Sequence, residues 1–132
     1  MNERNYDLDE RLIDFAALII NVTETFPKTI SGNYLAGQLL KSGTAPALLY
    51  GEAHASESRN DFIHKMKITL KQLRESHNSL RIIKKLKWKP KECESMVNEV
   101  NQLISVFVKS IKTAQADNLQ KEKGPVNKDS SS

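Results

Sequence analysis

The sequence of 132 residues contains a single cysteine, Cys93, so no disulfide bond can form within the chain. A chain without disulfides fits a reducing compartment, and we expect a cytoplasmic protein. Glycine and proline are also scarce, with five and four residues. A β-sandwich needs turn residues about every ten positions, so this scarcity argues against one. The composition therefore favours an all-α fold.

Long apolar segments are missing as well. The longest uninterrupted run, Phe15 to Ile20, is far shorter than the roughly 20 residues of a membrane-spanning helix. The first residues are polar and acidic, and they lack the basic start and apolar continuation of a signal peptide. We expect a soluble protein that has no membrane partner.

The patterns of common catalytic and cofactor sites are absent too. The sequence has no P-loop, no dinucleotide-binding glycine pattern and no nucleophile elbow. Its three histidines do not have the spacing of metal ligands. Cys93 lies near Lys89 and Lys91, which would lower the pKa of a thiol, but no histidine stands beside it. We therefore predict a protein that is not an enzyme, with no cofactor, no metal and no small-molecule substrate.

Positive charge is concentrated in one part of the chain. The formal charge is +4, yet residues 59–91 alone carry eleven basic and two acidic side chains, a net of +9. Residues 1–58 carry four basic and eight acidic side chains, and residues 92–132 carry five and six. The excess therefore belongs to one element and the turn that follows it.

Apolar residues recur with helical spacing in four segments. The first, from about Leu8 to Thr25, carries an apolar row at alternating spacings of four and three: Leu8, Leu12, Phe15, Ile19, Val22 and Phe26. Pro27 predicts its end. The second segment reaches from a cap at residues 31–33 to about Glu57, and its Pro46 predicts a kink near Gly43 or a division into two helices.

The third helix has a clear start, because Ser58 and Asp61 have the spacing of a capping box. It should continue to about Leu86 with an apolar row of Phe62, Met66, Leu70, Leu73, His77 and Leu80. Pro90 suits the first position of a fourth helix, expected to last to about Ala114. The apolar row of this helix is Val97, Val100, Ile104, Phe107 and Ile111.

Short connections between long helices favour antiparallel neighbours. The fold class is therefore an all-α, antiparallel up-down-up-down four-helix bundle. We assign residues 1–116 to the bundle. The polar residues 117–132 are predicted to form a disordered, flexible C-terminal tail.

Several short motifs in the second and third segments resemble a known family. They are a Gln-Leu-x-basic-Ser pattern with Gln38, Lys41 and Ser42, then Glu52, then a Ser-x-x-Asp-Phe pattern with Ser58 and Phe62. In this order and spacing they resemble the bacterial four-helix-bundle proteins, also called rRNA-intervening-sequence proteins, over roughly residues 8–88. The chain departs from the family pattern at Leu49, where the family has Asn, at Ala53, where it has Gly, and at residues 45–46.

The resemblance implies a bundle that assembles into a ring-shaped pentamer. Related accessory subunits of diversity-generating retroelements bind nucleic acids or a reverse transcriptase. We therefore expect a homo-oligomer that acts as an interaction or scaffold subunit. Apolar residues outside the main rows supply a second apolar face for such contacts: Ile13, Ile20, Leu40, Leu48, Leu49 and Ile82.

A basic stripe on the third helix supports an alternative function. Five cations fall within about 40° of one line along that helix: Lys67, Lys71, Arg74, Arg81 and Lys85. Such a row can contact successive phosphates of RNA or DNA. It can equally be a solvated face, or pair with acids of a neighbouring helix or subunit. Trp88 would either stack on a base or close the end of the bundle.

Overall fold

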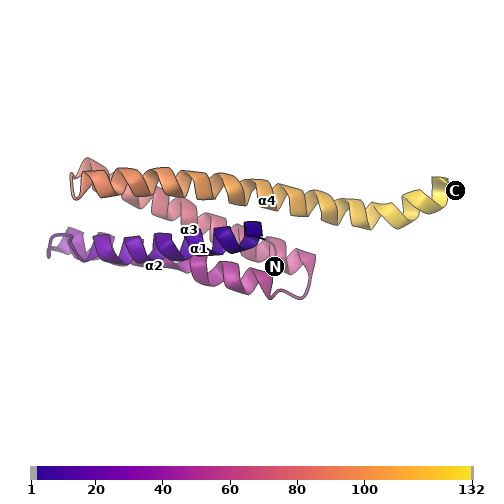
Figure 1. Cartoon of the computed structure of the whole chain (residues 1–132), viewed down its shortest axis with the longest axis horizontal. Coiled ribbons are helices and arrows are strands. Elements are labelled where there is room, and N and C mark those ends of the chain that lie inside the picture. The colour runs from indigo at the N-terminus through magenta and orange to yellow at the C-terminus, as the bar shows by residue number, and fades with distance from the viewer. Residues whose placement is uncertain (1–2, 132) are drawn as a thin grey trace.

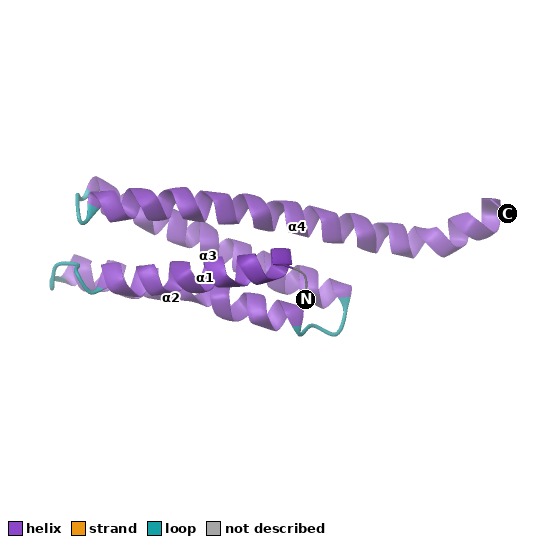
Figure 2. Cartoon of the chain, viewed as in Figure 1, coloured by secondary structure: helices purple, strands orange, loops and turns teal. Residues whose placement is uncertain are grey.

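The protein folds into four helices joined by short loops (Figures 1 and 2). The structure, a computed structural model, describes the backbone of residues 3–131 and the side chains of residues 7–120. The helices are α1 (Glu3–Thr23), α2 (Ile30–His54), α3 (Arg59–Lys85) and α4 (Pro90–Ser131), and no strand occurs in the described backbone. The predicted all-α class is confirmed.

Neighbours in sequence are neighbours in space. α1 packs on α2, α2 on α3 and α3 on α4, whereas α1 and α4 contact each other little. Two contacts fix the antiparallel register of α3 and α4. At one end Lys84 approaches Glu94 to 3.8 Å, and at the other Asn118 donates a hydrogen bond of 2.7 Å to Asn60. The residue numbers of each pair add to 178, so the two helices stay in register along their length, as predicted for an up-down bundle.

The apolar row predicted for α1 is confirmed in full. All six members, from Leu8 to Phe26, are buried in the core. On α4 the prediction was partly wrong. Val97 and Ile104 are only half-buried, and the core row is instead Cys93, Met96, Val100, Leu103, Phe107, Ile111 and Ala114. Both rows are apolar at seven-residue spacing, so the packing against α3 decides which one is covered.

The start of α2 differs from the prediction. The N-cap is Thr29 and not residues 31–33, because the Gly32 amide donates a hydrogen bond of 3.0 Å to the Thr29 hydroxyl. Gly32 permits this tight start, since a Cβ at this position would stand 1.8 Å from the carbonyl oxygen of Pro27. The predicted cap of α3 is confirmed, with the Asp61 amide donating to the Ser58 hydroxyl over 3.1 Å.

α2 is not divided at its proline. It continues as one helix through Pro46, which is itself buried, as are the neighbouring Gly43 and Tyr50. The missing N–H costs one backbone hydrogen bond, but Pro46 is buried and the nearby Gly43 packs closely on Ile19 of α1, in a helix that packs on both α1 and α3. Tertiary packing therefore overrides the local preference for a break.

α4 extends beyond the end predicted near Ala114 and continues to Ser131 (Figure 1). Residues 115–123 are mostly good helix formers, and adding a residue to an existing helix is easier than starting one. Asp117 and Asn118 still contact the first turn of α3. Ser132 and the side chains from residue 121 onward lie outside the described residues, and the predicted flexibility of residues 117–132 stays a prediction.

Gly43 allows close contact between α1 and α2. A Cβ at this position would lie 2.7 Å from Cγ1 of Ile19, whereas a Cβ at Gly37 meets nothing within 4 Å. We predict that Gly43→Ala destabilises the bundle by about 1–3 kcal/mol through overpacking. Gly37→Ala, the matched control, should stabilise it by about 0.5–1 kcal/mol through helix propensity. Urea unfolding measures both changes, and equal effects of the two variants would contradict this account.

Candidate functional site

The basic stripe of α3 lies on the surface of the bundle. Its five members, Lys67, Lys71, Arg74, Arg81 and Lys85, are all exposed. None of them forms a salt bridge with another described residue, although three other cations of α3 do, namely Arg59, Lys65 and Lys84. The predicted stripe is therefore one continuous row of cations without acidic partners inside the described bundle.

His77 lies beside this stripe and contributes no charge to it at neutral pH. Burial lowers the pKa of the imidazole, and the charges of Arg81 and Arg74 lower it further. Because the histidine stays neutral, the positive charge of the stripe comes from its lysines and arginines.

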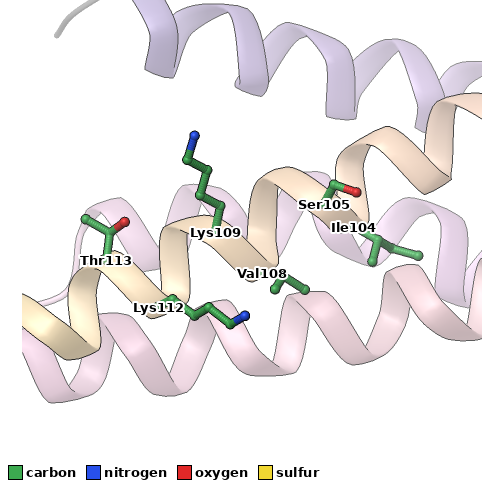
Figure 3. Close-up of a pocket in the computed structure, with 6 residues that line it drawn as sticks. All are labelled: Ile104, Ser105, Val108, Lys109, Lys112 and Thr113. Carbon is green, nitrogen blue, oxygen red and sulfur yellow. The ribbon is translucent and has the colours of Figure 1, made fainter.

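An apolar row runs along α4 next to the basic stripe. Val97, Ile104 and Val108 are half-buried and lie outside the core row. Ile104 and Val108 line a shallow hollow of about 370 Å³, and in Figure 3 they point toward α3, as Lys112 does, while Lys109 points the opposite way. With the α4 register given above, Arg74 is level with Ile104 and Arg81 with Val97. We call this surface, cations on α3 and apolar side chains on α4, the basic groove.

A second surface lies along α1 and α2 and is apolar. Ile13, Ile20, Leu40 and Leu48 are 46%, 42%, 36% and 72% exposed. The contact between Ile19 and Gly43 places residues of α1 and α2 whose numbers add to about 62 at the same level. Leu48 is thus about level with Ile13 and Leu40 with Ile20, and Ala17 lies between the two isoleucines on α1. We call these side chains the apolar edge. Of the other surplus residues, Leu49 is half-buried and Ile82 lies on α3.

The residues of the family pattern do not form one site. Gln38, Lys41 and Glu52 are exposed on α2, whereas Ser58 caps α3 and Phe62 packs half-buried near His54. Ser42 is buried between helices. Its hydroxyl oxygen finds no hydrogen-bond partner among the described residues, and neither does Oε1 of Gln72. The pattern therefore marks positions that build the α2–α3 pair, with three polar side chains left on its surface.

Trp88 closes the end of the bundle. The turn after α3 is a Schellman motif, in which the amides of Lys87 and Trp88 donate to the carbonyls of Lys84 and Ile83. Lys87 takes the left-handed conformation that the motif requires, with φ 64°. This turn directs the indole into the bundle, where its ring centre lies 5.5 Å from that of Phe26. The indole therefore packs against the end of the bundle, the second of the two roles considered for Trp88.

Cys93 does not have the reactive environment suggested by the nearby lysines. Its side chain is fully buried, and burial raises the pKa of the thiol. The charge of Glu92 raises it further, and Lys84 offsets part of the effect. The thiol donates a weak hydrogen bond of 3.4 Å to the Trp88 carbonyl. The expected lowering of its pKa was wrong, because burial dominates.

A cleft of about 1090 Å³ opens between α1 and α4, near the C-terminal end of α2. Its lining includes Leu8, Phe62, Met66 and Tyr50, and Arg11 lies at the α1 side. Arg11 donates two hydrogen bonds, of 2.8 and 3.0 Å, to the carboxylate of Glu99. This bidentate ion pair is the salt bridge that joins α1 to α4 within the described residues.

Tyr50 supplies a pH-dependent test of this region. Burial, aided by the charge of Asp9, raises the pKa of its hydroxyl to about 12, against an ordinary value of 10.0. Above pH 10 the unfolded chain loses this proton while the folded chain keeps it, so stability falls between about pH 10 and 12. The urea midpoint should therefore decrease more from pH 9 to pH 11 for the natural protein than for Tyr50→Phe. An equal drop in both proteins would refute the assignment.

The described residues contain no cluster of three or more histidine, cysteine or acidic side chains that could hold a metal ion. Within the same part of the chain, none of the helices combines the length and the hydropathy needed to span a membrane.

Comparison with known proteins places the chain in a family. The model of the 23S rRNA-intervening sequence proteins matches residues 4–109, and the chain belongs to that family. It is similar to the crystal structure of a protein of unknown function from the S23 ribosomal protein family of Bacteroides thetaiotaomicron VPI-5482. The TM-score is 0.75 at 25% identity, over 82% of this chain and 97% of that one. No curated protein matches the chain.

Proposed function

We propose that this member of the 23S rRNA-intervening sequence protein family is a non-enzymatic interaction subunit that associates with copies of itself. The observation that supports the proposal is the apolar edge of α1 and α2. Leu48 is 72% exposed, and it is about level with the exposed Ile13 of α1. A contiguous exposed apolar patch marks a protein interface more often than a solvated surface. The resemblance described above supports a closed ring of five copies, acting as a scaffold in the cytoplasm.

Replacing apolar side chains of this edge tests the assembly. We expect Ile20→Gln combined with Leu48→Gln to convert the oligomer into a monomer of 14.9 kDa, measured by size-exclusion chromatography with light scattering. The matched control is Leu18→Gln combined with Leu86→Gln, which changes two other side chains, 51% and 46% exposed, outside the edge. It should keep the oligomer. A natural protein that is monomeric at micromolar concentration would defeat the proposal.

A second candidate function is binding of RNA or DNA through the basic stripe. It is favoured by five exposed cations that have no acidic partner among the described residues. Such a row neutralises phosphates and releases counterions, so the affinity would fall steeply with salt and depend little on sequence.

The corresponding test is a salt series with single-stranded RNA. Each phosphate contact adds about −0.7 to the slope of log affinity against log salt. Changing Lys67, Lys71 and Arg74 to Glu should abolish binding at low ionic strength. Changing Lys28, Lys41 and Lys91 to Glu alters the net charge equally outside the stripe and should leave most of the affinity. Equal losses in the two triple variants would remove the stripe as the binding site.

A further inference from the structure

The basic groove has the features of a docking site for a helix. Its α3 side carries the five cations of the stripe, and its α4 side carries Val97, Ile104 and Val108. The acids of this surface are few: Glu94 stands near Lys84 at one end, and Glu75 lies on α3 next to Lys71. A helix that fits here needs an apolar stripe flanked by carboxylates.

α1 of the same protein presents such a stripe to solvent. Ile13, Ala17 and Ile20 recur at spacings of four and three, which places them on one face. The acids next to them are Glu10, Asp14 and Glu24, all exposed. The single basic residue among the described side chains of α1 is Arg11, which points the other way and is bound by Glu99. On α2, the cation Lys41 is about level with Ile20 in the register set by Ile19 and Gly43.

The spacings of the two surfaces match. Ile13 and Ile20 are seven residues apart, and so are Val97 and Ile104, which corresponds to about 10 Å along a helix. The acids Glu10, Asp14 and Glu24 follow each other at four and ten residues. Lys67, Lys71 and Arg81 show the same spacing, and Lys71, Arg81 and Lys85 show it in reverse. Only one direction satisfies both sets. When α1 docks antiparallel to α3, with Glu10 level with Lys85 and Asp14 with Arg81, the register of α3 and α4 brings Ile13 and Ile20 within one residue of Val97 and Ile104.

We infer that the basic groove of one copy receives the outer face of α1 from a second copy. This inference rests on the proposed self-association and adds the contact surface. The two surfaces differ from each other, so the contact is heterologous, and repeating it gives a ring or an open filament. In the assembly the basic stripe is paired with carboxylates of the neighbour, so a nucleic acid and a neighbouring subunit compete for the same cations.

Charge reversal tests the contact. One variant carries Glu10→Lys and Asp14→Lys, and the other carries Arg81→Glu and Lys85→Glu. Each changes two exposed side chains, and circular dichroism checks that each keeps its helices. Either variant alone should be monomeric by light scattering, because like charges meet at the contact. One chain carrying all four changes should recover the mass of the natural oligomer, because opposite charges meet again at every contact. An equimolar mixture of the two variants should also associate, but only with the two variants alternating.

The controls reverse equal charges elsewhere. Glu52→Lys with Glu57→Lys, and Lys28→Glu with Lys91→Glu, alter exposed side chains outside both surfaces and should keep the oligomer. An oligomer that survives both charge-reversed variants overturns this inference while leaving self-association intact. A monomeric natural protein defeats self-association itself. If Arg81→Glu with Lys85→Glu abolishes RNA binding but keeps the oligomeric mass, the stripe belongs to nucleic acid and the inference is wrong.

Discussion

α3 holds the bundle together, because it packs against α2 on one side and α4 on the other. Its buried row consists mostly of uncharged apolar side chains, from Ile63 to Ile83. The two hydroxyls within this row, Thr69 and Ser76, donate hydrogen bonds to carbonyls one turn earlier, so they enter the core with their hydrogen-bonding needs met. Because this row faces the core, the five cations of the basic stripe lie at the surface of α3, beside the half-buried apolar side chains of α4.

Much of the fold could be predicted from the periodicity, and the exceptions have physical reasons. On α1 the apolar row is unambiguous and every member is buried. On α4 two apolar rows compete, and only contact with α3 selects Met96 and Leu103 over Val97 and Ile104. On α2 the sequence predicted a break at Pro46, but two neighbouring helices compensate for the missing hydrogen bond. Local patterns predict the helices, and packing between helices decides their rotation and continuity.

The positions of the candidate site residues were predicted better than their role. Helical geometry placed the five cations on one exposed line, and the structure agrees. The apolar periodicity of α4 did not predict its side of the basic groove, since it assigned Val97 and Ile104 to the core. It also could not show that Trp88 is held by the turn after α3 and packed on Phe26. The sequence of one chain predicts where the cations lie, but the molecule that binds them is a property of the partner.

The open side between α1 and α4 also affects how the bundle unfolds. α2, α3 and α4 support one another along two long interfaces, while α1 is attached mainly through α2 and the Arg11–Glu99 ion pair. We therefore expect the amide hydrogens of α1 to exchange at a lower free energy than those of the packed segments of α2, α3 and α4, as a separate cooperative unit. If a neighbouring subunit covers the outer face of α1, assembly slows that exchange, and the least secure helix of the monomer becomes a protected one in the oligomer.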